Sequence, residues 1–363
     1  MESMLLTRSD GRRIRSLPPM QKIIPYIMRS RAASINLFQE HVDCTPLNNY
    51  ICAHEVNGQR TMSTMHLLIA AIVRVVAQRP QLNRFVVHSR VYARKDIVVS
   101  FVVHRSLRIE DGGTTIKLTF NGTESLPQIV QIINEAIARE TASYDTQNST
   151  DKLAEAFMRL PGFLIRSMIG FVMGLDKYNL LPNAVLEASP FHATVFLTNL
   201  KSLGIDSVYH HQYEFGTNGL FVSMGKEMDA TVIERDGSVG IRPIMNLNIT
   251  LDERFCDGLY FAKSIKILRK YLRDPALLET PLEKKEEDLQ EVLSAAVESV
   301  RSFTEYKRQA VRIQGEEGKR LCCDLGWTGE AIGNILKNCS EHTPEGGCIR
   351  IRAEQNAIYT RIS

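Results

Sequence analysis

The chain of 363 residues has little of several features that mark specialised proteins. Its formal net charge is only +3, which by itself gives no case for nucleic-acid binding. No segment repeats along the chain, which argues against a solenoid or a propeller. No Cys/His set has the spacing of a zinc site, so no metal is predicted. What is present, 44% hydrophobic and 23% charged residues, is typical of a soluble globular protein.

A disulfide framework is also missing. The cysteines number seven, an odd count without framework spacing, and Cys322 and Cys323 are adjacent. The N-terminus has no apolar run of the kind found in signal peptides. We therefore expect a reducing compartment and a cytoplasmic protein.

The sequence has no apolar run long enough to span a membrane. The most apolar stretch, "LPGFLIRSMIGFVMGL" at 160–175, contains Arg166 and is shorter than the roughly 20 residues that a spanning helix needs. It predicts a buried or interface helix, and its Met, Phe and Ile side chains leave contact with a membrane surface open. Stable membrane insertion is not expected.

Basic residues gather near the N-terminus. Between residues 8 and 31, Asp10 is the one acid among many arginines and lysines. Two interpretations remain open for this stretch. It wraps over an acidic surface of its own chain, or it meets an anionic ligand or lipid surface.

Helical and strand patterns alternate over the first 282 residues, which predicts a layered α/β domain. Residues 65–80 and 125–144 have helical patterns, and 258–275 is an amphipathic helix that ends before Pro275. The strand-like segments are 97–106, 115–120, 192–200, 219–226, 229–237 and 240–252.

The composition changes at about residue 279, where a charged stretch leads into a helical stripe. We predict three parts: a domain over 1–282, a connecting helix or linker over 283–306, and a fragment over 307–363. Within the fragment the pattern indicates two strands, a helix and two more strands.

The stretch "LNITLDERFCDGLYFAKSIKILRKYLRDP", residues 247–275, joins a strand to a helix through an acid-rich turn. An aspartate at a helix start caps free backbone N–H groups, so an isolated turn of this kind is usually structural. The sequence on both sides of this turn indicates that the turn has a functional role as well.

The stretch resembles the active-site segment of the acyltransferase component of 2-oxo acid dehydrogenase complexes, and of chloramphenicol acetyltransferase. In that family a His-x-x-x-Asp-Gly motif ends a strand and precedes a helix. Segments at 20–51, 66–86 and 193–204 are similar, in order, to other parts of the family's domain. The resemblance spans roughly residues 12–279 and is closest to stand-alone members, because no lipoyl domain precedes residue 12.

The catalytic His of the family aligns with Glu253. In the family this His takes the proton from the thiol of coenzyme A or dihydrolipoamide, because the thiolate is the nucleophile. A glutamate of ordinary pKa, about 4.3, is a weak base for that task. Burial at a subunit interface would suit Glu253 to general-base catalysis, provided that no cation neutralises it.

Two further residues of the family's site have counterparts here. Thr198 aligns with the hydroxyl that stabilises the oxyanion of the tetrahedral intermediate, a Ser in most relatives. Asp257 aligns with the Asp that holds the turn rigid through a charge pair, so the resemblance implies a supporting role. Other candidates remain: His210 or His211 as the base, and Cys256 as an acyl-carrying nucleophile or as a small buried residue.

The C-terminal stretch is similar to the first half of the ATP-binding domain of sensor histidine kinases. Asn334 and Asn338 match an Asn-x-x-x-Asn helix whose second Asn ligates Mg²⁺ on ATP in that family. The adenine-binding loop and the Gly-rich lid are not found before Ser363, and 286–303 lacks the phospho-accepting His. We expect a truncated, inactive fragment without ATP binding, and a docking module is the alternative.

The resemblance therefore implies a chloramphenicol-acetyltransferase-like two-layer sandwich, a mixed sheet plus helices, followed by a truncated ATPase-like fragment. It implies a homotrimer with sites between subunits, and acyl transfer between coenzyme A and a small thiol, amine or hydroxyl acceptor. Two alternatives stay open. One is a catalytically inactive trimeric binding or scaffold protein, and the other is a regulatory protein that acts through its kinase-like tail.

Overall fold

The computed structural model describes residues 8–14, 17–104, 113–142, 160–234, 236–282, 285–315, 318–323, 325–355 and 360–362. Internal contacts divide the chain into two units, Met1–Leu282 and Glu283–Ser363. The division falls close to the change in composition. Each unit is described by itself.

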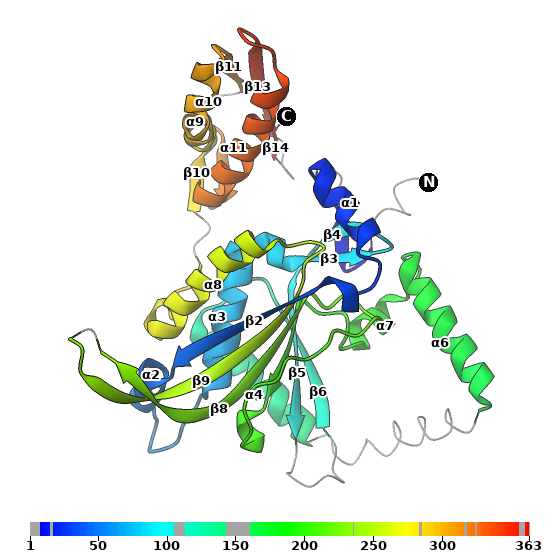
Figure 1. Cartoon of the computed structure of the whole chain (residues 1–363), viewed down its shortest axis with the longest axis vertical. Helices are drawn as coiled ribbons and strands as arrows, with labels where there is room; N and C mark the ends of the chain where they lie inside the picture. The colour runs from blue at the N-terminus through cyan, green and yellow to red at the C-terminus, as the bar shows by residue number, and fades with distance from the viewer. Residues whose placement is uncertain are drawn as a thin grey trace. The chain divides into compact units, whose positions relative to one another are not determined.

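The first unit contains a six-stranded mixed sheet with the strand order β2-β9-β8-β7-β5-β6 (Figure 1). Strand β7 pairs parallel with β5 and β8, and the other neighbours are antiparallel. The expected mixed α/β class is confirmed. The strands are β2 (Ile35–Asp43), β5 (Ile97–His104), β6 (Gly113–Phe120), β7 (Val195–Asn199), β8 (Leu220–Ile233) and β9 (Val239–Asp252).

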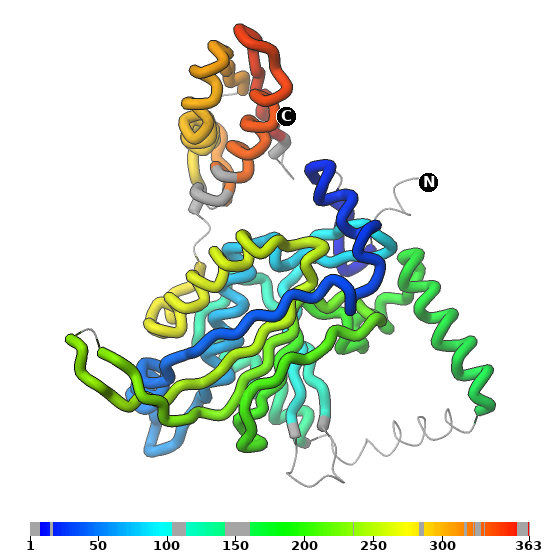
Figure 2. The backbone as a smooth tube through the Cα atoms, in the orientation of Figure 1, coloured from blue at the N-terminus to red at the C-terminus, as the bar shows by residue number. Residues whose placement is uncertain are grey.

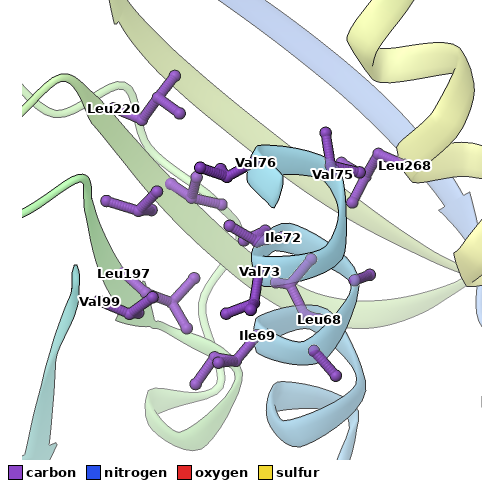
Figure 3. Packing of buried hydrophobic residues seen from close by; sticks show 14 of the residues in the cluster. Leu68, Ile69, Ile72, Val73, Val75, Val76, Val99, Leu197, Leu220 and Leu268 are labelled. Atoms are coloured by element: carbon purple, nitrogen blue, oxygen red, sulfur yellow. The ribbon is translucent and has the colours of Figure 1, made fainter. Parts of the chain in front are cut away.

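Helices α3, α4 and α8 bury their apolar residues against one face of this sheet. Helix α3 is apolar almost all round, so it lies at the centre of the core, where Ile72 and Val73 pack near Leu197 (Figure 3). The helices are α1 (Pro19–Ile27), α2 (Thr45–Ala53), α3 (Thr64–Gln78), α4 (Leu126–Ala142), α6 (Gly162–Lys177), α7 (Asn183–Ala188) and α8 (Gly258–Arg273).

A second, three-stranded sheet in the order β1-β4-β3 belongs to the same unit. Its strands are β1 (Gly11–Arg13), β3 (Arg84–Val87) and β4 (Arg90–Arg94).

The segments 219–226 and 229–237, predicted as two strands, form the single strand β8 up to Ile233. The gap between the two predicted strands corresponds to a β-bulge between Met224 and Glu227. A bulge leaves pairing intact on both sides and bends the strand. Beyond it β8 and β9 continue as a hairpin that reaches past the other strands (Figure 2).

Helix α6 differs from the expectation of a buried helix. Phe163, Ile169 and Phe171 are 69%, 50% and 67% exposed, and Asp176 is the buried residue of the helix. The described part of the chain therefore does not cover this apolar surface, and the predictions of an interface or a membrane surface remain. Among the described residues, no helix is both long and apolar enough to cross a membrane.

The basic N-terminal stretch binds its own chain at two buried arginines. Arg8 forms ion pairs with Asp10 and Asp176 at 2.8 Å each. Arg31 donates through Nη1 to the backbone oxygen of Asn218 at 2.6 Å. For these two residues the interpretation as an arm over the chain's own surface is correct.

The second unit has its own core. Strand β11 pairs parallel with β13, β13 pairs antiparallel with β14, and β10 pairs with β12. Helices α9 and α11 pack together, and both give buried apolar residues to this core, Val292 and Leu336 among them. The described part of the predicted connecting helix or linker, residues 285–306, therefore falls within this unit. The elements are β10 (Lys285–Asp288), α9 (Leu289–Ser299), α10 (Arg301–Tyr306), β11 (Ala310–Gln314), β12 (Arg320–Cys323), α11 (Leu325–His342), β13 (Cys348–Gln355) and β14 (Thr360–Ile362).

Candidate active site

The turn at 253–257 connects β9 to α8. Asp257 stands at the N-cap of α8, where its Oδ1 accepts a hydrogen bond from the Tyr260 backbone N–H at 2.8 Å. Such a cap satisfies a backbone donor that the helix leaves free. Asp257 is exposed and has no ion pair among the described residues. It supports the turn as a helix cap, which differs from the charge pair that the resemblance implied.

The charge pair of this turn is made by Asp252 and Arg254. Arg254 donates through Nε and Nη2 to the two Asp252 carboxylate oxygens, at 2.9 and 2.6 Å. Asp252 is fully buried and Arg254 is 7% exposed. A bidentate pair in a buried place fixes the direction in which the chain leaves the strand.

Glu253 lies between these two residues and is half-buried. Its backbone N–H donates to the oxygen of Ser34 at 2.8 Å, which ties the turn to the start of β2. Its carboxylate has no hydrogen bond or ion pair within the described part of the chain, since Arg254 is engaged by Asp252.

A small cavity of about 30 Å³ adjoins the turn. Its lining includes Glu253, Arg84 and Cys256. Burial raises the pKa of Cys256 to about 12. Its thiol is therefore neutral at ordinary pH, which disfavours the acyl-cysteine alternative.

Thr198 lies on β7, paired with Ser223 of β8, which in turn pairs with Asn248 of β9. Glu253 comes five residues after Asn248. Strand β9 ends at Asp252, four residues beyond Asn248, so at about 3.3 Å per residue the end of the strand is about 13 Å from the level of Thr198. One copy of the chain therefore does not bring Thr198 and Glu253 together.

The loop before β8 covers the sheet face that carries Thr198 and Ser223. The Val208 backbone N–H donates to Ser223 Oγ at 3.1 Å. The His210 ring stacks on Phe221 with 4.1 Å between ring centroids. Phe221 is two residues from Ser223, the strand partner of Thr198, so His210 lies over the sheet near the level of Thr198. His211 stacks on His210 at 4.6 Å.

Asn334 and Asn338 are both exposed on α11, four residues apart and so on one face of the helix. The described part of the chain holds no group of three His, Cys, Asp or Glu that would hold a metal ion. The similarity to a nucleotide site remains a prediction.

Residues 217–280 match the family model for the catalytic domain of 2-oxoacid dehydrogenases acyltransferase. The match covers β8, β9, the turn and α8, and therefore both Glu253 and Asp257. This segment of the mixed α/β unit is acyltransferase-like. A search of curated proteins finds no match to the sequence.

Several solved structures are similar to the chain. A probable dihydrolipoamide acetyltransferase from Listeria monocytogenes 4b F2365 has 16% identity and a TM-score of 0.45, over 70% of this chain and 92% of that one. A truncated catalytic core of the 2-oxoacid dehydrogenase multienzyme complex from Thermoplasma acidophilum has 18% identity and a TM-score of 0.43, over 72% and 98%. A chloramphenicol acetyltransferase has 14% identity and a TM-score of 0.44, and the match covers 72% of this chain and 99% of that one.

The sequence did not indicate the contacts around the turn. The sequence shows Asp252 and Arg254 as charged residues close together, but it does not show that they pair with each other. Because of this pairing, Arg254 does not form an ion pair with Glu253. If the strand continued through the turn, alternation would put Arg254 on the face opposite to Glu253. The chain has left the strand by residue 253, so the alternation no longer holds.

Proposed function

We propose that the first unit transfers an acyl group between coenzyme A and a small thiol, amine or hydroxyl acceptor. The observation that carries the proposal is the match of 217–280 to an acyltransferase catalytic domain. The matched segment presents an unpaired carboxylate, Glu253, at the position of the family's base. The engagement of Arg254 by Asp252 supports Glu253 as a proton acceptor.

The proposed reaction begins when Glu253 takes the proton from the acceptor's S–H, N–H or O–H group. The acceptor atom then attacks the carbonyl carbon of the acyl thioester. The Thr198 hydroxyl donates a hydrogen bond to the oxygen, which becomes negative in the tetrahedral intermediate. The carbon–sulfur bond breaks, and the proton passes from Glu253 to the sulfur of coenzyme A.

The separation of the two residues within one chain requires that the site form between copies. We therefore propose a homotrimer in which Glu253 of one copy meets Thr198 of the next. The apolar residues that the single chain leaves exposed on α1 and α6 provide surface for self-association. Met20 is 66% exposed and Ile27 is 69% exposed.

The test is thiol release from a panel of acyl-coenzyme A esters with dihydrolipoamide and other small acceptors. Glu253→Gln is nearly isosteric and removes the charge, so turnover should collapse while the chain stays folded. Glu135→Gln, at an exposed position of α4, is the matched control and should behave as wild type. Equal turnover in wild type and Glu253→Gln would reject Glu253 as the base and turn attention to His210→Gln.

A non-catalytic binding or scaffold protein is the second candidate. It is favoured by the glutamate in place of the family's His and by the small size of the cavity beside it. Saturable binding of coenzyme A without turnover of any ester, in the wild-type chain, would select this candidate.

A further inference from the structure

Positive charge is concentrated in the three-stranded sheet β11-β13-β14 of the second unit. The sequences of these strands contain Arg312, Arg350, Arg352 and Arg361, and the one acid among them is Glu354. Over the second unit as a whole, by contrast, acidic residues outnumber basic ones. The positive charge therefore belongs to this sheet and not to the composition of the unit.

Alternation along the strands directs three of these arginines away from the core. Ile349 and Ile351 of β13 are buried in the core that includes α9 and α11, whereas Arg312, Arg350 and Arg352 are exposed. Successive residues of a strand point to opposite faces of the sheet. The three arginines therefore share the face opposite to the core, and we call Arg312, Arg350 and Arg352 the arginine face.

Arg312 and Arg350 stand side by side on this face. They are partners in the parallel register of β11 and β13, and neighbouring strands are about 4.8 Å apart. Like charges at this spacing repel each other and lower stability. Neither side chain has a hydrogen bond or an ion pair to another described residue. An anionic group from a binding partner would offset the repulsion.

The arginine face fits an extended acidic peptide better than a nucleic acid or a membrane. Arg350 and Arg352 are two residues apart, about 6.6 Å along a parallel strand, and alternate residues of an extended peptide have the same spacing. Sheets that bind single-stranded nucleic acid present aromatic side chains on which bases stack. The exposed neighbours here are Ala310, Gln314 and Cys348, which offer neither a stacking ring nor a large apolar group for a lipid surface.

We infer that the arginine face docks an extended acidic segment of a partner protein. One carboxylate of the segment accepts hydrogen bonds from Arg312 and Arg350 together, and the carboxylate two residues further on reaches the level of Arg352. Guanidinium groups suit this task because their planar set of N–H donors matches a carboxylate. The docking belongs to the second unit and does not depend on acyl transfer by the first.

Fluorescence anisotropy with the full chain tests this docking. The probe is a fluorescein-labelled peptide of alternating threonine and glutamate, and the matched peptide has glutamine in place of glutamate. At about 0.05 M salt the glutamate peptide should bind and the glutamine peptide should not, and binding should weaken as the salt concentration rises to about 0.5 M.

The double variant Arg312→Gln with Arg350→Gln should weaken binding of the glutamate peptide about tenfold, which is the scale of two exposed charge contacts. Both residues are exposed, and the substitution removes a repulsion, so the unit should stay folded. Arg301→Gln is the matched control. It is exposed on α10, which packs against α9 and α11, and should bind the peptide as wild type does.

A gain of binding separates docking from misfolding. Arg312→Glu with Arg350→Glu should bind a peptide of alternating threonine and lysine more tightly than wild type does, because the charge of the face is reversed. The docking is contradicted if the glutamate peptide does not bind wild type, or if the double glutamine variant binds it as tightly as wild type. Tighter binding of oligothymidine or of phosphatidylserine vesicles than of the peptide would overturn it in favour of a nucleic acid or a membrane.

Discussion

At the scale of single residues, the environment of Glu253 is set by its neighbours. Arg254 would neutralise the carboxylate if it were free, but the bidentate contact with Asp252 holds it. The pair thus has two consequences: it fixes the exit from β9, and it leaves the Glu253 carboxylate without a partner among the described residues. Both depend on the burial of Asp252 and Arg254.

The buried pair should be sensitive to the loss of either partner. Arg254→Met leaves Asp252 charged in a buried place, and the chain should lose about 3–5 kcal/mol of unfolding free energy. Urea unfolding followed by circular dichroism measures this. The exposed pair of Arg60 and Glu55 is the control, and Arg60→Ala should leave stability nearly unchanged.

Trp327, the one tryptophan of the chain, reports on the second unit during the same experiment. Its fluorescence transition should stay in place in Arg254→Met, because the substitution lies in the first unit. An Arg254→Met chain as stable as wild type would contradict the account of the turn.

At the scale of elements, the bulge in β8 sets the position of the loop that carries His210. A Cβ at Gly225 would lie 2.4 Å from Asp206 Oδ1 and 2.5 Å from the Ser207 backbone nitrogen. The loop therefore approaches β8 closely because residue 225 has no side chain. Asp206 Oδ2 also accepts a hydrogen bond from Asn246 Nδ2 of β9 at 2.9 Å, which fastens the loop to the sheet.

Gly225→Ala should displace this loop, at a cost of about 1–3 kcal/mol in unfolding free energy. Gly170→Ala on α6 is the matched control, because a Cβ there meets nothing within 4 Å. In a helix the control should be neutral or slightly stabilising. Equal unfolding free energies for Gly225→Ala and wild type would show that the loop does not depend on the close approach.

Local patterns predicted most elements, because helix and strand periodicity reflects which face is buried. Helix α8, for example, is predicted at 258–275 and extends from Gly258 to Arg273 in the structure. Long-range structure was not available from the pattern. The pattern predicted two separate strands where the structure has a β-bulge within β8. It also predicted a buried helix at α6, whose apolar side chains are left exposed by the residues that the structure describes.

The same limit applies to the candidate sites. The position of Glu253 was predicted from the motif, and the match to 217–280 includes it. The buried hydrogen bond from Arg94 Nη2 to the Thr217 hydroxyl was not predicted, because these two residues are 123 positions apart along the chain.

At the scale of the whole molecule, buried histidines should make the first unit sensitive to acid. Burial lowers the pKa values of His192 and His66 below 6.5. The unfolded chain binds these protons near pH 6.5, whereas the folded chain binds them only at lower pH. Stability is therefore highest above about pH 6.5 and declines as the pH falls below it.

The pKa values of Asp10 and Asp176 are also lowered, chiefly by Arg8 and, for Asp176, by His192, against the opposing effect of burial. Their contribution is present above about pH 3.8 and is lost as the pH falls further. Urea unfolding at pH 7.5, 5.5 and about 2.5 should show both losses. His192→Gln should reduce the first loss, and a wild-type stability that is flat from pH 7.5 to 5.5 would contradict the assignment.

The central claim is that Glu253 and Thr198 act together across two copies of the chain. Complementation tests it most directly. Glu253→Gln keeps Thr198, and Thr198→Val keeps Glu253, so each variant alone should lose about 10²-fold or more in turnover. When the two are co-expressed in equal amounts and mix at random, about a quarter of all sites unite one intact residue from each variant.

The measurement is thiol release from acyl-coenzyme A by the co-expressed mixture, compared with each variant and with wild type. The account predicts that the mixture recovers up to about a quarter of wild-type turnover, far above either variant alone. A mixture no more active than the average of the two variants would contradict a site shared between copies.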